Sequence, residues 1–177
     1  MMDRISDVRE PEGNYVERHN FHRICQQAGR PAQPNATSIV AAIDRLITDS
    51  RAGGGPEIEF YDDLPIEELP SELQMVMFLI VKELLANACR HSESNNVLVG
   101  LGQDDGRVCI QVQDWGVGFD PEMVQLYRHG LKVVQQFVQW RGGTMSIDSR
   151  SGGGTCVAIE IPLSLGNGPR DPNCERG

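Results

Sequence analysis

Apolar residues recur at helical spacing soon after a polar N-terminal stretch. The pattern over Ser38 to Thr48 follows a potential capping residue at Asn35 or Thr37, whose side-chain oxygen can accept from the free N–H groups of a first turn. The glycine- and proline-bearing segment 53–56 is unsuited to continue a helix. We therefore predict an amphipathic helix over 38–48. Its apolar face contains Ile39, Ala42, Ile43, Leu46 and Ile47.

The longest helical pattern covers about Ser71 to His91. Ser71 and Gln74 resemble an S-x-x-Q capping box, in which two side chains satisfy free N–H groups at a helix start. One stripe of this helix is predicted to be buried and contains Leu73, Val76, Met77, Ile80, Leu84 and Ala88. A shorter helix is predicted after Gly130, with apolar positions at Leu131, Val134, Phe137 and Val138.

Other segments alternate apolar and polar residues, which is typical of strands. A first strand is predicted around Ile58 to Phe60, and the acidic run at 62–68 that follows is predicted to be a solvated loop. Alternation over 97–101 and again over 108–112, with the turn Asp104-Asp105-Gly106 between them, predicts a hairpin.

Two further strands are predicted over Met145–Ser149 and Thr155–Pro162, with the loop 150–154 between them. The order of elements is therefore α β α β β α β β. Most neighbouring strands are joined by hairpins, and a purely parallel sheet would need a helix between successive strands. We predict a two-layer α/β sandwich, in which a mixed, mostly antiparallel sheet packs on helices.

The polar ends of the sequence set the expected domain limits. Residues 1–35 are predicted to be a polar leader or linker, because they carry mixed charges and three prolines. Residues 165–177 are rich in Gly, Pro and Asn, which predicts a disordered tail. The compact domain is expected over 36–164.

Composition narrows the possible function classes. The 177 residues allow one compact domain, and 25 Asp and Glu against 16 Lys and Arg give a formal charge of −9. That charge disfavours a protein that binds nucleic acid through a net basic face. The longest apolar run, Met75 to Val81, is far shorter than the roughly 20 residues of a membrane helix. With no signal-peptide pattern at the N-terminus, we expect a cytoplasmic chain without membrane contact of its own.

The five cysteines are an odd number and show no C-x-x-C spacing. This argues against a disulfide framework and against a zinc site. We interpret them as reduced thiols, with Cys89, Cys109 and Cys156 as small residues in or near the core.

A polar row interrupts the long helix. Glu83, Asn87 and His91 fall at i, i+4 and i+8, beside the apolar stripe rather than opposite it. Such groups are costly at the edge of a core unless they have partners. Two interpretations stay open: a structural network that fixes the helix on the sheet, or one wall of a polar pocket.

Asp114 breaks the pattern of a strand. By alternation from Val108 through Val112 it continues the inward face, and Gly116 and Gly118 follow it. One interpretation is an ordinary turn. The other is a carboxylate that accepts a hydrogen bond from a flat ligand slotted over the glycines.

Two further glycine positions are compatible with ligand binding. Gly130 immediately precedes a predicted helix, whose N–H groups can hold an anion, and Gly152 to Thr155 join two strands in what is otherwise a flexible hairpin loop. A G-x-x-x-x-G-K-S/T phosphate loop is absent, as are the H-E-x-x-H, G-x-S-x-G and H-R-D motifs. These absences weigh against metalloproteases, G-x-S-x-G hydrolases and eukaryotic-type protein kinases.

Taken together and in order, four motifs resemble the catalytic ATP-binding domain of sensor histidine kinases. They are Glu83-Leu-Leu-Ala-Asn87-Ala-Cys-Arg90-His91, Asp114-Trp-Gly116-Val-Gly118-Phe119, Gly130-Leu131, and the segment from Arg141-Gly-Gly to Gly154-Thr155. This domain has the Bergerat fold, shared with gyrase B, Hsp90 and MutL. The resemblance covers about residues 36 to 163 and is strongest to the nitrate-sensor-like branch, which has a short lid over the nucleotide.

For the phosphate end of the site, the resemblance implies the following roles. Asn87 would coordinate the Mg²⁺ that bridges the ATP phosphates, and Glu83 would orient or activate the attacking group as the catalytic residue. Arg90 and His91 would lie near the phosphates. An amide oxygen suits Mg²⁺, which takes few protein ligands alongside phosphate oxygens and water.

For the base end, the resemblance implies that Asp114 accepts from the adenine amino group. Gly116 and Gly118 would leave room for the base. Gly130 and Leu131 would end the lid with backbone donors at a helix start. Gly154 and Thr155 would complete the nucleotide site, and Thr155 would support Asp114 from the neighbouring strand.

The sequence departs from a complete kinase of this type at its N-terminal side. The upstream histidines are His19, followed by Asn20, and His22, followed by Arg23, so neither has the acidic neighbour of a phospho-accepting histidine. The resemblance therefore implies a γ-phosphoryl transfer to a histidine on another domain or chain, with a response regulator downstream.

Two rival functions stay open. One is a serine kinase of the anti-sigma-factor type with the same fold. The other is a non-enzymatic adaptor or phosphotransfer module that kept the fold, although retention of Glu83, Asn87 and Asp114 with the glycines argues against lost nucleotide binding.

Overall fold

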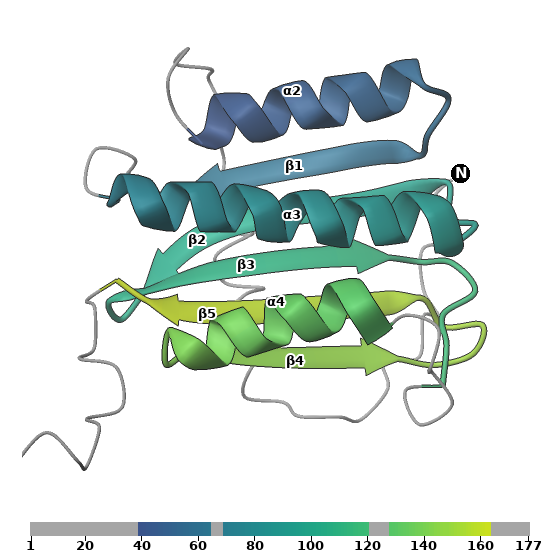
Figure 1. Ribbon diagram of the computed structural model, residues 1–177. Helices are drawn as coiled ribbons and strands as arrows, with labels where there is room; N and C mark the ends of the chain where they lie inside the picture. Colours follow the sequence, from purple (N-terminus) through teal and green to yellow (C-terminus); the bar gives the residue numbers. More distant parts are fainter. Residues whose placement is uncertain (1–38, 65–68, 121–127, 164–177) are drawn as a thin grey trace, which may run out of the picture.

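The computed structural model describes residues 39–64, 69–120 and 128–163 (Figure 1). Three helices and five strands lie in this part of the chain. In order they are α2 (Ile39–Ala52), β1 (Glu57–Asp63), α3 (Ser71–His91), β2 (Asn96–Asp104), β3 (Arg107–Asp114), α4 (Arg128–Trp140), β4 (Thr144–Ser149) and β5 (Thr155–Pro162).

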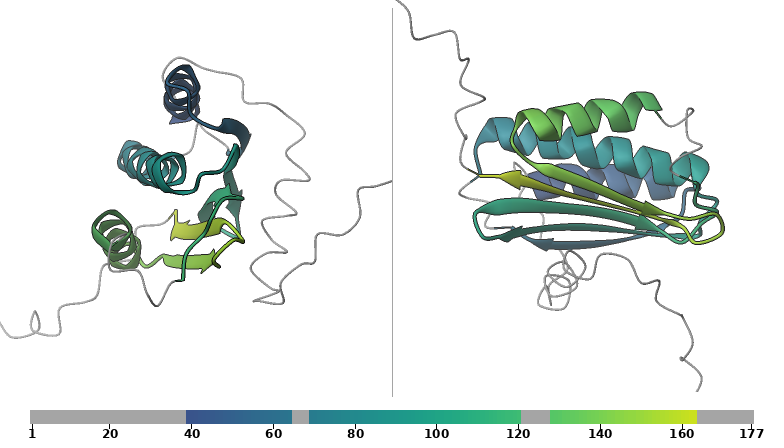
Figure 2. Two further views of the ribbon diagram at one scale, coloured as in Figure 1. Left: turned by 90° about the vertical axis from the view of Figure 1, so that its right-hand side faces the viewer. Right: turned by 90° about the horizontal axis from the view of Figure 1, so that it is seen from below.

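The strands form one mixed sheet in the order β1-β2-β3-β5-β4. Only β1 and β2 run parallel, across the connection that contains α3, and the other three pairings are antiparallel. Figure 2 shows the helices in a single layer on one face of the sheet. The predicted two-layer α/β sandwich is therefore confirmed.

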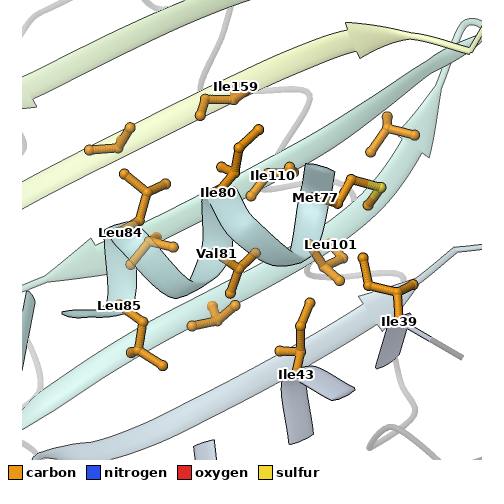
Figure 3. Packing of buried hydrophobic residues seen from close by; sticks show 14 of the residues in the cluster. Ile39, Ile43, Met77, Ile80, Val81, Leu84, Leu85, Leu101, Ile110 and Ile159 are labelled. Carbon is orange, nitrogen blue, oxygen red and sulfur yellow. The ribbon is translucent and has the colours of Figure 1, made fainter. Parts of the chain in front are cut away.

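The core lies between the helix layer and the sheet. Its centre is α3, whose buried side chains meet the inward positions of β2, β3 and β5, and α2 closes it on the β1 side (Figure 3). The buried residues of α3 are Leu73, Met77, Ile80, Val81, Leu84, Leu85 and Ala88. The predicted stripe is largely confirmed, with Val76 only partly buried and Val81 and Leu85 added.

The hairpin between β2 and β3 is also confirmed. Asp104 pairs with Arg107, which leaves Asp105 and Gly106 as a two-residue loop. Both loop residues have positive φ, 44° at Asp105 and 71° at Gly106. This is the backbone of a type I′ turn, whose twist matches that of the strands, and it explains the Asp-Gly sequence.

Several boundary predictions are wrong. No capping box exists at the start of α3: Pro70 occupies the cap position, and the Gln74 side chain donates to the Leu69 carbonyl at 2.9 Å. Asp62 and Asp63 belong to β1 rather than to a loop. Partial burial raises the pKa of the Asp62 carboxyl. The carboxyl also accepts a hydrogen bond from the Leu64 N–H, which lowers the pKa by a smaller amount.

The helices also begin and end differently from the prediction. α2 continues four residues past Thr48, to Ala52. The chain leaves the helix through the glycines that follow, and Gly54 has a positive φ of 80°. α4 begins at Arg128, so Gly130 is its third residue rather than the residue before it. The proposed caps Asn35 and Thr37, the leader at 1–35 and the tail at 165–177 lie outside the described residues.

None of the three cysteines in the described ranges takes part in a disulfide. Cys109 is buried, while Cys89 and Cys156 are partly buried. Burial raises the pKa of the Cys109 thiol to about 11, and the acidic Glu160 and Asp104 add to the rise. Cys109 is therefore a protonated, unreactive group at neutral pH.

Candidate functional site

A polar row crosses the sheet where three of its strands begin or end. Asp114 is the register partner of Thr155, and Thr155 is in turn the partner of Ser149. Register partners in antiparallel strands project to the same face. Because Asp114 and Ser149 are both buried, each only 6 % exposed, this row lies on the helix-facing side at the edge of the core.

Asp114 is the charged group of this row. Its Oδ1 accepts from the Gly116 N–H at 3.0 Å, and the carboxyl also accepts from the Thr155 N–H. Burial raises the pKa of the Asp114 carboxyl above its ordinary value, and these two donors oppose that rise. The prediction that Asp114 faces inward at the end of its strand is confirmed.

The glycines around Asp114 are required by contacts of backbone with backbone. A Cβ on Gly116 would lie 1.8 Å from the Ser92 carbonyl oxygen, and one on Gly118 would lie 2.0 Å from that of Arg150. Gly154 is required for the same reason, because a Cβ at this position would lie 2.3 Å from the Asp114 carbonyl oxygen. The loop after β3 is therefore interlocked with the end of α3 and with the β4–β5 loop.

This interlock changes the explanation of the glycines. Gly116 and Gly118 were expected to leave room for a base. Gly116, like Gly154, meets protein backbone instead, whereas Gly118 meets backbone and also lines a cavity. Hydrogen bonds hold the same loops together: Val117 N–H donates to Ser92 O at 2.7 Å, and Gly152 N–H donates to Val117 O at 2.6 Å.

The second wall of the site is the last two turns of α3. The Asn87 amide nitrogen donates to Glu83 Oε1 at 3.4 Å, a long bond between neighbouring turns. Asn87 and His91 line the cavity described below, and Glu83 does not. Asn87 and His91 therefore stand on a pocket wall, as one interpretation of the row predicted, whereas the bond between Asn87 and Glu83 stays within α3 and does not fix the helix on the sheet.

Glu83 lies against the first turn of α4. A Cβ on Gly130 would be 1.7 Å from Glu83 Oε1, so the carboxylate occupies the space that a side chain at 130 would need. A carboxylate is stabilised near a helix N-terminus by the free N–H groups and the helix dipole. The Glu83 carboxylate therefore packs against Gly130, a contact that the sequence did not predict.

The two walls enclose an open cavity, whose space of about 460 Å³ includes the solvent at its mouth. Its floor and sides are mostly apolar, with polar groups at two places. Its lining residues are Leu84, Asn87, Ala88, His91, Ser92, Val112, Asp114, Gly118, Phe119, Leu131, Thr155 and Val157.

The cavity unites six of the predicted site residues. They are Asn87, His91, Asp114, Gly118, Leu131 and Thr155. The other five, Glu83, Arg90, Gly116, Gly130 and Gly154, are outside the lining, and Arg90 is exposed on α3. Gly116 and Gly154 nevertheless touch Ser92 and Asp114, which line the cavity, and Gly130 touches Glu83.

Sequence reasoning did not assign several residues to the site, among them two that line the cavity and one that supports it. Phe119 and Ser92 line the cavity, and Ser149 bonds to the loop that carries Phe119. Ser149 had one signal, since it ends a strand in register with Thr155, but that register exists only once the strands are paired. Ser92 acts mainly through its carbonyl, which no side-chain pattern reveals.

The arrangement suits a flat ligand with a hydrogen-bond donor at its inner end. Val112, Val157 and Leu84 provide apolar surface, and Asp114 provides a buried acceptor at the bottom. Asn87 and His91 stand on the other wall. The described residues hold no group of three or more His, Cys, Asp or Glu side chains that would form a metal cage by themselves.

Comparisons with known proteins agree with this geometry. Residues 73–165, just over half of the chain, match the family model of histidine kinase-, DNA gyrase B-, and HSP90-like ATPases. The oxygen sensor histidine kinase NreB of Staphylococcus carnosus is 26% identical over 139 residues, which cover 76% of this chain and 39% of that protein. The histidine-protein kinase/phosphatase DegS of Bacillus subtilis is 32% identical over 125 residues, covering 68% of this chain and 32% of DegS.

Solved structures support the fold. A blue-light activated histidine kinase of Erythrobacter litoralis has a TM-score of 0.59 at 26% identity and covers 72% of this chain and 42% of its own. The Acinetobacter baumannii histidine kinase AdeS has a TM-score of 0.57 at 15% identity, covering 84% of this chain and 77% of its own, and shows the fold alone. The chain spans less than half the length of the curated relatives that it matches.

None of the helices within 39–64, 69–120 and 128–163 combines the length and apolar content that crossing a bilayer requires.

Proposed function

This chain belongs to the family of histidine kinase-, DNA gyrase B-, and HSP90-like ATPases, and we propose that it is the Mg-ATP-binding catalytic domain of a two-component sensor histidine kinase. In this proposal the γ-phosphoryl group of ATP passes to a histidine on a separate domain or chain. A response regulator then receives it, and the use of ATP places the reaction in the cytoplasm.

The observation that carries the proposal is the cavity with Asp114 at its inner end. Its apolar sides and single buried carboxylate suit the face and the amino group of adenine. The two backbone donors hold the carboxylate in place, which favours its ionised, accepting form against the effect of burial. Asp114, Gly118, Leu131 and Thr155 are thus proposed to contact the adenine end of ATP.

The residues on the α3 wall fit a magnesium ion held mainly by phosphate. The Asn87 amide nitrogen is directed to Glu83, so the amide oxygen takes no part in that bond, and amide oxygens are ligands that Mg²⁺ accepts. Mg²⁺ commonly takes one or two protein ligands plus phosphate and water, so no dedicated cage is required. When bound, it would neutralise charge on the phosphates.

The chain's own residues would then perform three tasks. Asp114 and the apolar sides fix the base, which positions the phosphates at the α3 wall. The exposed Arg90 offers positive charge next to His91, which lines the cavity wall. Glu83 is proposed to orient or activate the attacking histidine, which requires its carboxylate to be available beyond its contact with Gly130. Phosphoryl transfer depends mainly on such positioning and charge neutralisation.

Calorimetric titration of the full chain with a non-hydrolysable ATP analogue tests the binding step. We expect saturable binding that is tighter with Mg²⁺ than with EDTA. A chain that gives neither heat nor a thermal shift at millimolar analogue would contradict the proposal. The transfer step is tested separately by adding γ-labelled ATP and a phospho-acceptor histidine domain from a relative, with label expected on that domain.

A further inference from the structure

The Ser149 hydroxyl connects three segments of the site. It is buried at the end of β4, where it accepts from the Phe119 N–H at 2.9 Å and donates to the Gly154 carbonyl at 3.1 Å. Its oxygen also lies 2.9 Å from Thr155 Oγ1. A hydroxyl has one proton and two acceptor positions, so these three partners satisfy it completely.

The nature of the partners decides the direction of each bond. The Phe119 amide can only donate and the Gly154 carbonyl can only accept, so the Ser149 proton is assigned to Gly154. If it turned toward Thr155 instead, the oxygens of Ser149 and Gly154 would face each other at 3.1 Å with no proton between them. The Thr155 hydroxyl must therefore donate to Ser149.

This assignment sets the polarity that Thr155 presents to the cavity. With its proton held by Ser149, the Thr155 hydroxyl retains only acceptor positions for a ligand. Thr155 lines the cavity beside its register partner Asp114, whose carboxylate is also an acceptor. Two neighbouring acceptors suit an amino group, which has two protons, and oppose a carbonyl oxygen, which has none.

We propose that Ser149 is a positioning residue that determines base specificity: by holding the Thr155 hydroxyl as an acceptor, it favours a purine with an exocyclic amino group over a purine with a carbonyl at the same position. The inference rests on the proposed nucleotide-binding function. Ser149 itself is outside the cavity lining and acts through Thr155 and through the loop that carries Phe119.

The test compares ATP with inosine triphosphate, which has a carbonyl where ATP has its amino group. Dissociation constants of both are measured by calorimetry on the full chain, with Mg²⁺, for the wild type and Ser149→Ala. We expect Ser149→Ala to reduce the preference for ATP about fivefold, because the Thr155 hydroxyl becomes able to rotate and donate, and one hydrogen bond contributes an effect of this size.

Two variants control for a merely structural effect. Ser149→Thr keeps the hydroxyl and should retain the preference for ATP. Ser146→Ala removes an exposed hydroxyl from the same strand and should leave both affinities unchanged. If Ser149→Ala weakens ATP and inosine triphosphate by the same factor, or weakens neither, Ser149 does not determine specificity and the inference is overturned.

The remaining outcomes are also distinguishable. If Ser149→Ala does not fold, the near-isosteric Thr155→Val removes the acceptor directly and must reduce the preference for ATP; an unchanged preference overturns the inference. A wild type that prefers ATP while Ser149→Ala keeps that preference overturns the inference alone. A wild type that binds neither nucleotide overturns the proposed function and this inference with it.

Discussion

The two walls of the cavity are built in different ways. At the sheet end, the position of Asp114 is set by backbone: three glycines pack against carbonyl groups, and loop N–H groups bond to Ser92 and Val117. At the helix end, Glu83, Asn87 and His91 are side chains of one helix, and the bond from Asn87 to Glu83 is 3.4 Å long.

The difference indicates separate requirements for the two ends of a nucleotide. A flat base of constant shape is best held by a site that does not rearrange, because each ordered side chain costs conformational entropy when it binds. A metal-bound phosphate chain changes its charge and geometry during transfer, and side chains with rotatable bonds can follow it. Substitutions should therefore affect stability at the sheet end and phosphate handling at the helix end.

The largest effect is expected for Gly116→Ala. The new Cβ would lie 1.8 Å from the Ser92 carbonyl oxygen, so the loop after β3 must move away from α3. We expect a loss of about 3 kcal/mol in the free energy of unfolding, the upper part of the range for overpacking, together with loss of ATP binding. Urea denaturation followed by circular dichroism measures it.

Gly153→Ala is the matched control for that substitution. Gly153 is in the neighbouring loop, has no positive φ, and its Cβ would meet nothing nearer than 3.5 Å. Its unfolding free energy should change by less than about 0.5 kcal/mol. Equal destabilisation by the two variants would contradict the interlock.

Asp114→Asn should produce the next largest effect, on affinity rather than on fold. The amide removes the charged acceptor at the inner end of the cavity, and a hydrogen bond to a charged group contributes roughly 1.5–3 kcal/mol. ATP and adenosine should both bind more than about tenfold more weakly. Calorimetry with the two ligands checks this, and retained adenosine affinity would exclude Asp114 from base recognition.

Asn87→Ala should have a smaller effect that depends on the metal. It removes the amide oxygen proposed for Mg²⁺, so ATP affinity should fall several-fold with Mg²⁺ and little with EDTA, and adenosine affinity should be unchanged. Titrations with and without the metal separate these cases. If Asn87→Ala and Asp114→Asn reduce adenosine binding alike, the two walls do not divide the nucleotide as proposed.

The smallest effect is expected from pH. Because burial raises the pKa of Asp114, its protonation occurs at a higher pH than for an ordinary aspartate. Protonation removes the acceptor, so adenosine affinity should fall as the pH is lowered, starting at a higher pH than the ordinary pKa of an aspartate would give. The effect on stability has the opposite sign for the protein without ligand. A group whose pKa is raised in the folded state stabilises the fold at low pH, and this stabilisation is lost as the pH rises through the folded-state pKa.

Adenosine is the suitable ligand for this measurement because it lacks titrating phosphates. The Asp114→Asn variant is the control and should bind adenosine with little dependence on pH. If its pH profile matches that of the wild type, another group causes the decline.

Much of the fold could be predicted because it follows from local chemistry. The period of the apolar residues predicted α3 and the β2–β3 hairpin, and Asp104-Asp105-Gly106 predicted the turn between the two strands. The start of α3 was predicted with the wrong cap, because Pro70 takes the cap position and Gln74 bonds backward to Leu69. A capping motif specifies only residue types, whereas the cap that forms also depends on the path of the residues before the helix.

The sequence by itself determined that Asp114 faces inward at the end of its strand and that Glu83, Asn87 and His91 lie along one side of α3. The tertiary structure decided what these residues do, because the decisive contacts join distant segments. Phe119 and Ser149 are 30 positions apart, and Glu83 meets Gly130 from another helix. Alternation can predict which side of a strand a residue faces. Only the pairing of the strands brings the Ser149 hydroxyl to the Phe119 amide, the Gly154 carbonyl and the Thr155 hydroxyl.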